Sequence, residues 1–294
     1  MRPDWIAVDW GTTNLRAWAM QGESPVAEVS SDEGMGGLAP DQFESALLGL
    51  IDGWLPEGET TLVLACGMVG ARQGWIEAAY AEVPARPFDA ASCVKAPASD
   101  PRLDARIIPG LCQMNPPDVM RGEETQIAGF LAGRPGHEGT LCLPGTHTKW
   151  VRVAEGQVQG FRTMMTGELF GLLSRQSVLR HSVSEGSDVD AFAGAVRRAQ
   201  VDPSALAGTL FGIRAASLLA GQTGEQGAAR LSGLLIGAEI ASARPSGPVT
   251  IIGAGALAQL YSQALALSGH EVDIADAQGV TLAGLCAAYQ EIRP

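Results

Sequence analysis

A polar turn near the start of the chain has the residue types that bind phosphate. Gly11 permits a tight turn, and the amides and side chains of Thr12, Thr13 and Asn14 can surround an anion. Asp9, at the end of a short apolar strand, can hold a hydrated Mg²⁺ beside such a phosphate. A plain polar hairpin turn is the alternative interpretation of these residues.

A second polar turn of similar form occurs in the middle of the chain. It consists of Gly145, Thr146, His147 and Thr148, followed by Lys149. The chain has only two lysines, and one placed just past a Gly-Thr turn can contact a phosphate or a carboxylate. His147 can donate a hydrogen bond to a phosphate. An exposed strand cation and a solvated histidine are the alternatives.

A third glycine-rich turn lies near the end of the sequence. Gly253, Ala254, Gly255 and Ala256 fit a strand–GxGxxA–helix pattern, with Asp276 at the end of the next expected strand. This pattern is typical of a dinucleotide site and is the main support for an alternative function, that of an NAD-dependent oxidoreductase. However, only one strand remains after the helix, and a doubly wound half needs more. We therefore favour a turn that lets adenine and ribose lie against bare backbone.

Two glutamates at an expected helix start are candidates for acid–base chemistry. Glu123 or Glu124 can act as general base on an alcohol, or both can simply interact with the helix dipole. Arg72 lies on a glycine-rich loop after a buried strand and can contact a substrate, although a plain surface loop fits as well. Glu168 follows another strand-to-helix corner that is expected to face the same site.

Apolar periodicity predicts which elements position these residues. The first half is expected to contain strands at 6–8, 15–20, 26–29 and 62–66, a helix from near 41 to 54, mostly loop over 84–118 with a short strand at 106–108, and a helix at 123–133. The second half is expected to contain strands at 140–143, 149–153 and 158–165, helices over 167–243, strands at 249–252 and 272–275, and helices at 256–267 and 280–289.

This order contains a weak internal repeat. Each half starts with a hairpin that carries Gly-Thr, and each has a helix rich in small residues, at 127–133 and 282–288. The repeat predicts two similar α/β domains that face each other across a cleft. We expect an N-terminal domain over 1–133 and a C-terminal domain over 134–294 that carries a helical insertion at about 168–245.

Composition narrows the class of protein. The chain has 294 residues, a net charge of −12 and a pI of about 4.8, so it lacks the broad basic footprint that binds nucleic acid or an anionic membrane. Five scattered cysteines without a CxxC pair argue against disulfides or zinc and suit the cytoplasm. Glu239 interrupts the most apolar stretch, 231–243, which is too short to span a bilayer, and the start lacks a signal-peptide pattern.

Taken together, the motifs resemble those of the acetate and sugar kinase, Hsp70 and actin superfamily. Residues 9–14 resemble its first phosphate motif, 145–148 its second, and 253–256 its adenosine motif. The two small-residue helices resemble its connecting helices. The resemblance implies two ribonuclease-H-like, actin-like ATPase domains with mixed five-stranded sheets on either side of a nucleotide cleft.

Within that superfamily, the sequences of these and neighbouring stretches are similar to those of the 2-dehydro-3-deoxygalactonokinase family. The matching stretches are residues 8–17, 67–75, 121–126, 143–150 and 165–169. The family implies a phosphotransferase that uses ATP and Mg²⁺ to phosphorylate the 6-hydroxyl of 2-dehydro-3-deoxy-D-galactonate in galactonate catabolism. Many superfamily members have an acidic residue where this chain has Leu143, so metal binding is expected to depend more on Asp9.

The resemblance also implies residue roles. In related sugar kinases the base is an Asp that is followed by Thr at the start of the first connecting helix. Here Glu124, followed by Thr125, occupies the similar position. Glu123 beside it and Glu168 are further candidates. The substrate carboxylate requires a cation, and the candidates on motif loops are Arg16, Arg72, Arg121 and Lys149. An NAD-dependent oxidoreductase and a non-catalytic nucleotide sensor remain as alternatives. Whether the chain forms a homodimer stays open.

Overall fold

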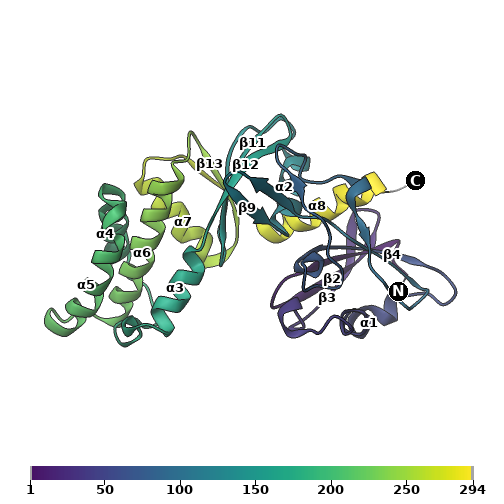
Figure 1. The fold of residues 1–294 in the computed structure, drawn as a ribbon, viewed down its shortest axis with the longest axis horizontal. Helices are drawn as coiled ribbons and strands as arrows, with labels where there is room; N and C mark the ends of the chain where they lie inside the picture. The colour runs from purple at the N-terminus through teal and green to yellow at the C-terminus, as the bar shows by residue number, and fades with distance from the viewer. Residues whose placement is uncertain (1, 293–294) are drawn as a thin grey trace. The chain divides into compact units, whose positions relative to one another are not determined.

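The computed structural model describes residues 2–292, and the contacts of the chain divide it into two units (Figure 1). Unit 1 comprises Met1–Glu138, Ala154–Gly160 and Ala277–Pro294; unit 2 comprises Gly139–Val153 and Phe161–Asp276. Each unit has its own mixed sheet. The prediction of two α/β units with mixed sheets is therefore confirmed.

Unit 1 is built on a sheet with the strand order β3-β2-β1-β4-β7-β6. The strands are β1 Trp5–Trp10, β2 Leu15–Gln21, β3 Ser24–Ser31, β4 Thr61–Gly67, β6 Val94–Lys95 and β7 Leu103–Ile107. β1 pairs antiparallel with β2 and parallel with β4, which in turn pairs parallel with β7. The expectation of five strands was wrong by one, because the two-residue strand β6 pairs with the edge of β7.

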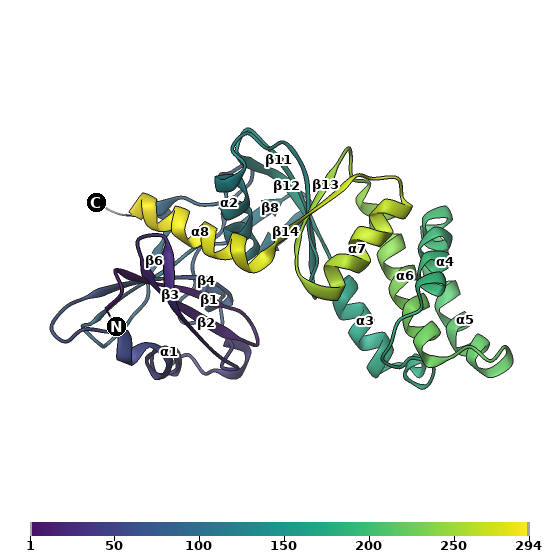
Figure 2. The same ribbon diagram turned by 180° about the vertical axis from the view of Figure 1, so that it is seen from behind.

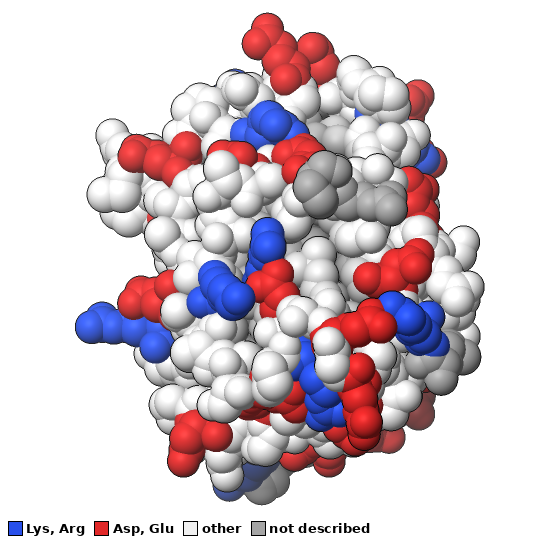
Figure 3. Space-filling view, turned by 90° about the vertical axis from the view of Figure 1, so that its right-hand side faces the viewer, with Lys and Arg blue, Asp and Glu red and all other residues white. Residues whose placement is uncertain are grey.

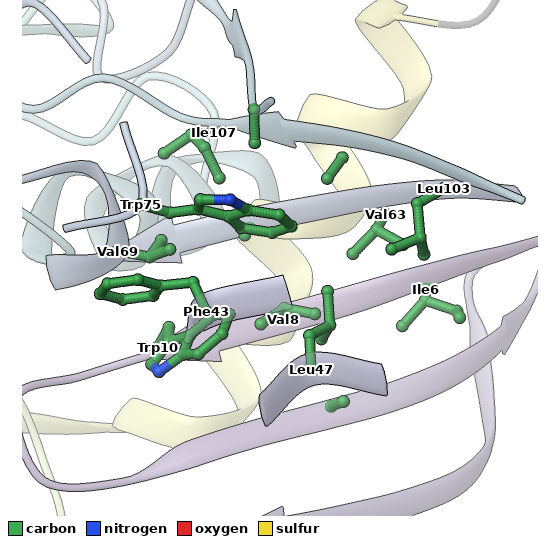
Figure 4. Close-up of a cluster of buried hydrophobic side chains, with 14 of the residues drawn as sticks. Ile6, Val8, Trp10, Phe43, Leu47, Val63, Val69, Trp75, Leu103 and Ile107 are labelled. Carbon is green, nitrogen blue, oxygen red and sulfur yellow. The ribbon is translucent and has the colours of Figure 1, made fainter. Parts of the chain in front are cut away.

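One face of this sheet packs on helix α1 (Phe43–Ile51). Its apolar residues recur at helical spacing, and Phe43, Leu47 and Ile51 are buried. Figure 4 shows Phe43 and Leu47 against Trp10, Trp75 and the aliphatic residues of β1, β4 and β7. This core fixes the end of β1, where the first polar turn begins.

The segment over 84–118 contains more structure than the sequence predicts. Strands β5 (Ala81–Glu82), β8 (Leu111–Met114) and β9 (Pro117–Met120) form a separate three-stranded sheet. β8 and β9 make a hairpin in which Met114 pairs with Pro117. The prolines indicated a loop, but proline is tolerated at the first residue of a strand, so the hairpin forms around them.

Helices α2 (Glu123–Gly133) and α8 (Ala277–Ile292) lie side by side in unit 1 (Figures 1 and 2). A Cβ on Gly129 would lie 1.9 Å from the Val280 carbonyl oxygen, and one on Gly284 would lie 2.0 Å from that of Thr125. The small residues thus permit a close crossing, as predicted. The sequence assigns α8 to the second domain, whereas its contacts group it with unit 1.

Unit 2 has a five-stranded sheet with the order β12-β11-β10-β13-β14. The strands are β10 Gly139–Leu143, β11 Thr148–Ala154, β12 Gln157–Met164, β13 Val249–Gly253 and β14 Val272–Asp276. β10 pairs antiparallel with β11 and parallel with β13, which pairs parallel with β14. This strand order, and the directions of these three pairs, match those of β3-β2-β1-β4-β7 in unit 1, so the two units share one topology.

Five α-helices complete unit 2: α3 Thr166–Arg175, α4 Val189–Val201, α5 Leu206–Leu219, α6 Gly224–Ala243 and α7 Gly255–Leu267. The longest, α6, starts with a capping box between Thr223 and Gln226 and is buried along most of its length. Short 3-10 helices occur at Met35–Gly37, Asp52–Trp54, Met68–Gly70, Ala90–Ser92, Val178–His181 and Pro203–Ala205. Among the described helices none is long and apolar enough to cross a membrane.

Acidic and basic side chains are interspersed on the face drawn in Figure 3. Within unit 1, Arg102 forms ion pairs with Asp100 and Asp52, and Arg106 with Asp104. Ion pairs at the protein surface contribute about 0–1 kcal/mol each, so the fold depends mainly on its apolar cores.

Candidate active site

The first polar turn, Gly11–Asn14, joins β1 to β2 and is supported from behind by the segment 34–36. The amides of Gly34, Met35 and Gly36 donate to the carbonyl oxygens of Thr13, Gly11 and Thr12 at 3.0, 3.0 and 2.9 Å. Thr12, Thr13 and Asn14 are exposed, and within residues 2–292 the Thr12 and Thr13 amides donate to no recorded acceptor. The turn therefore presents donors outward, which suits an anion.

Asp9 and Arg16, predicted to bind a metal and the substrate respectively, pair with each other. They face each other across β1 and β2, with 2.5 Å between Arg16 Nη2 and Asp9 Oδ2. The buried Cys66 thiol is 3.9 Å from Asp9 Oδ1. Asp9 is partly exposed beside the turn, so its carboxylate fits one ligand of a hydrated Mg²⁺ whose remaining ligands are water and phosphate oxygens. Arg16 competes for the same carboxylate.

Glu124 lies at the start of α2 and is completely buried. Its two carboxylate oxygens accept from the Gly122 amide at 2.9 and 2.7 Å, and Oε1 also accepts from the Thr125 hydroxyl. Burial, and then the nearby Glu123 carboxylate, raise the pKa of Glu124 to about 8. Glu124 is therefore a strong proton acceptor once ionised, but it does not reach solvent in this conformation.

Glu123 differs from its neighbour in exposure. It is half-buried, and its Oε2 accepts from the Arg121 amide at 3.1 Å. The sequence treats the two glutamates almost alike, because position along the chain does not reveal which carboxylate turns inward.

The predicted cations of unit 1 also differ in access. Arg72 is exposed on the loop after the short helix Met68–Gly70. Arg121 is buried beneath this loop; its Nη2 donates to the Ala78 carbonyl at 2.7 Å and its guanidinium stacks 4.3 Å from the Tyr80 ring centre. Arg121 Nε and Nη1 lack a hydrogen-bond partner among the described residues. This loop region therefore contains two cations: Arg72, which is exposed, and Arg121, which has two N–H groups without a hydrogen-bond partner among the described residues.

The second polar turn lies between β10 and β11 in unit 2. Thr146 and His147 are exposed, and His147 Nε2 is 2.5 Å from Glu168 Oε2 at the start of α3. The Glu168 amide donates to the Thr146 carbonyl at 3.0 Å, so α3 is attached directly to the turn. Lys149 is buried, with Nζ 3.2 Å from the His147 carbonyl oxygen.

Thr148 is not on the exposed side of this turn, although the sequence groups it with the phosphate ligands. It is fully buried as the first residue of β11, and its hydroxyl lies 2.8 Å from that of Tyr261. Tyr261 in turn donates to Glu239, which also accepts from the Trp150 indole. Sequence reasoning missed Tyr261 and Glu239; the one available signal was a lone glutamate inside an apolar stretch.

A cavity of about 430 Å³ opens beside the second turn within unit 2. It lies between helices α3, α4, α6 and α7 and has a largely apolar lining. Gly145, Gly167, Phe170, Phe192, Leu257 and Tyr261 are among its lining residues. The cavity has the size and chemistry of a pocket for a planar, mostly apolar group such as a nucleobase.

The third glycine-rich turn contributes to the same cavity. Gly253 ends β13, Ala254 caps α7, Gly255 begins it and Ala256 lines the cavity. β14 follows at the edge of the sheet, so the strand order differs from that of a doubly wound dinucleotide fold. The geometry does not support the NAD-dependent alternative.

Comparison with known proteins decides the family. A family model for 2-keto-3-deoxy-galactonokinase matches residues 9–288. The chain belongs to this family. It is 42% identical over 301 residues to the Rhizobium meliloti (strain 1021) protein named 2-dehydro-3-deoxygalactonokinase DgoK1, covering 99% of this chain and 98% of that one. It is 37% identical over 279 residues to the 2-dehydro-3-deoxygalactonokinase of Escherichia coli (strain K12), covering 92% of each.

Solved structures agree with this assignment. The crystal structure of a Sinorhizobium meliloti protein assigned as a 2-dehydro-3-deoxygalactonokinase matches with a TM-score of 0.92 and 41% identity over 99% of both chains. Component A of the Acidaminococcus fermentans (R)-2-hydroxyglutaryl-CoA dehydratase matches with a TM-score of 0.53 at 14% identity over 98% of both chains, which shows a shared fold alone. The predicted family resemblance is confirmed, and neither the oxidoreductase nor the sensor alternative gains support.

Proposed function

We propose that this chain is a kinase that transfers the γ-phosphoryl group of ATP to the 6-hydroxyl of 2-dehydro-3-deoxy-D-galactonate. The observation that carries the proposal is the 42% identity, over almost the full length, to a relative named for this activity. Two polar turns and an apolar cavity beside the second supply the means to bind a nucleotide. We also propose a cytoplasmic location, where ATP is available and the free cysteines stay reduced.

In the proposed reaction the 6-hydroxyl oxygen attacks the γ-phosphorus. A P–O bond forms to the sugar acid, the bond between the β–γ bridging oxygen and the γ-phosphorus breaks, and ADP leaves with the bond electrons. The proton of the hydroxyl passes to a carboxylate. The Thr12 and Thr13 amides and the Gly145–His147 turn bind phosphate oxygens, and the cavity lined by Ala256 and Tyr261 receives the adenosine.

The most direct test of the activity is a phosphorylation screen over 2-keto-3-deoxy sugar acids of both stereochemistries at carbon 4. The proposal expects ADP release that depends on the galactonate-derived acid, and a product phosphorylated on oxygen 6. NAD in place of ATP serves as the control cosubstrate. ATP binding without turnover on any acid of the panel would contradict the proposal.

For the metal, we propose that Asp9 holds Mg²⁺ beside the transferring phosphate. The ion would neutralise charge that develops on the phosphate oxygens. Asp9→Asn removes the carboxylate charge and also releases Arg16 from its ion pair. We expect turnover at saturating ATP and Mg²⁺ to fall by about 10²-fold or more. Full activity of the variant, or a requirement for Mg²⁺ that stays unchanged, would contradict this role.

For the base, we propose Glu124, whose pKa of about 8 makes it a good proton acceptor when ionised. Its carboxylate must leave the Gly122 amide to reach a substrate. Glu124→Gln should lower kcat by about 10²–10⁴-fold with little change in ATP affinity. Glu123→Gln is the matched variant, and a large effect there with a small one in Glu124→Gln would assign the base to Glu123.

For the substrate carboxylate, we propose the loop that carries Arg72, with Arg121 beneath it. The support is that Arg72 is exposed and that Arg121 has two donors without a recorded partner among residues 2–292. Ala substitutions of Arg16, Arg72, Arg121 and Lys149 should single out one or two that raise the KM for the sugar acid while sparing that for ATP. Silent substitutions at all four would point to backbone amides instead.

A further inference from the structure

Glu239 is a buried carboxylate that no step of the proposed reaction uses. It lies on α6 with 4% of its surface exposed. Trp150 Nε1 donates to Oε1 at 2.7 Å and the Tyr261 hydroxyl donates to Oε2 at 2.8 Å, and the Thr166 hydroxyl is a third partner. All three partners are neutral side chains. A carboxylate is costly to bury, so an apolar residue of similar size would suit α6 better if packing were the only requirement.

The hydrogen bonds from Glu239 form a directed chain. The Tyr261 hydroxyl has one proton, and it points to Glu239. Tyr261 can therefore only accept from Thr148, whose hydroxyl is 2.8 Å away. Because the Thr148 proton is committed to Tyr261, its lone pairs face the Gly145 amide at 3.5 Å. Glu239, as the acceptor at the end of the chain, thus sets the direction of the hydrogen bonds from Tyr261 to the second turn.

We propose that Glu239 is a positioning residue for nucleotide binding, which acts through Tyr261 and Thr148 on the turn that begins at Gly145. This inference rests on the proposed function, because the turn is taken to bind ATP phosphate. Gly145 and Tyr261 also line the cavity assigned to adenosine. One buried chain of hydrogen bonds therefore connects the expected nucleoside pocket to the expected phosphate turn.

A Glu239→Gln substitution distinguishes this role from simple packing. Glutamine has nearly the same shape and can still accept from Trp150 through its oxygen, but its nitrogen donates. Tyr261 then accepts from the introduced amide nitrogen and donates to Thr148, which occupies one lone pair of the Thr148 hydroxyl and frees its proton. The Thr148 hydroxyl must rotate, so its remaining lone pair is no longer held toward the Gly145 amide and the turn loses this support.

The experiment measures the affinity of the purified full-length chain for Mg·ATP by calorimetry without sugar acid, together with KM values for both substrates. Glu239→Gln, Tyr261→Phe and Thr148→Val should each weaken ATP binding by about 5–30-fold, the effect of losing one or two buried hydrogen bonds. The KM for the sugar acid should stay within about twofold of the wild-type value. Thr148→Ser keeps the hydroxyl and should bind ATP as the wild type does.

Tyr289→Phe is the matched control, since it removes a hydroxyl from another buried tyrosine, one that stacks on Trp5 in unit 1. It should leave ATP affinity unchanged. Unaltered ATP affinity in both Glu239→Gln and Thr148→Val would overturn the inference, as would equal losses in Thr148→Ser and Thr148→Val. If Glu239→Gln does not fold, the Thr148 pair decides alone. Wild-type protein that binds no ATP would overturn the proposed function and this inference together.

Discussion

The two polar turns have similar sequences and equivalent places in their sheets, but they are held in different ways. The first, Gly11–Asn14, is held by main-chain hydrogen bonds from Gly34, Met35 and Gly36. The second, Gly145–Thr148, has one such bond, from the Glu168 amide to Thr146, and is otherwise held by side chains that lead through Tyr261 to Glu239. One topology can thus support a polar turn mainly by main-chain hydrogen bonds or mainly by side chains that lead to a buried carboxylate.

The difference has consequences for which substitutions each turn tolerates. The main-chain support of the first turn depends on close approach, because a Cβ at position 34 or 36 would lie too near the backbone of Thr12 and Thr13. Side-chain support depends on the charge and proton positions of a few buried groups. Substitutions at glycines near each turn test the dependence on close backbone approach. Substitutions at the buried carboxylates test the dependence on charge and proton position.

Among the glycines that support the two turns, the largest effect is expected for Gly34→Ala. A Cβ there would lie 2.2 Å from the Thr13 carbonyl carbon, so the supporting segment must move away from the first turn. We expect the KM for ATP to rise by about 10-fold or more, together with a loss of about 1–3 kcal/mol in the free energy of unfolding. Gly37→Ala is the control, since a Cβ at Gly37 has nothing within 4 Å. Equal behaviour of the two variants in ATP kinetics would show that the backbone contact is not needed.

A smaller effect is expected for Gly167→Ala, at the join between α3 and the second turn. Its Cβ would lie 2.3 Å from the Gly145 carbonyl oxygen, but the turn would still be attached to Glu239 through Thr148. We expect the KM for ATP to rise by about threefold to 10-fold. Gly171 lies in the same helix with open space around it. Gly171→Ala should therefore stabilise the fold by about 0.5–1 kcal/mol through helix propensity, which slightly raises the melting temperature. A larger effect at Gly167 than at Gly34 would reverse the comparison.

The last effect is a pH dependence of stability that differs between the two buried carboxylates. Burial raises the pKa of Glu124 to about 8, so its proton stabilises the folded state fully below the unfolded pKa of about 4.5. That stability is lost as pH rises toward about 8, with a slope of at most ~1.4 kcal/mol per pH unit. Urea unfolding across this range, from about pH 5 to about pH 8, should show a flatter profile in Glu124→Gln than in the wild type.

Glu239 provides the comparison for this measurement. Its pKa is also raised by burial, but hydrogen bonds from Thr166, Trp150 and Tyr261 favour the charged form. Glu239→Gln should therefore flatten the pH profile less than Glu124→Gln does. A greater flattening would mean that Glu239 is protonated in the folded protein and that the hydrogen-bond chain runs in the other direction.

The sequence by itself determined the local features of this protein. Alternation and helical spacing predicted most strands and helices, because side-chain periodicity depends on residues close in the chain. Glycine and threonine at the end of an apolar strand predicted both polar turns for the same reason. The spacing and order of these motifs were enough to identify the family, which the family model confirmed.

Only the tertiary structure decided which side chains face inward and what they meet there. The sequence could not separate buried Glu124 from half-buried Glu123, or place Thr148 inside rather than on its turn. Nor could it connect Glu239 to Gly145, because the two residues belong to distant segments of the chain. Burial and hydrogen bonding between distant segments depend on how sheets and helices pack. Neighbouring residues in the chain do not contain that information, so the support of each turn became visible only in three dimensions.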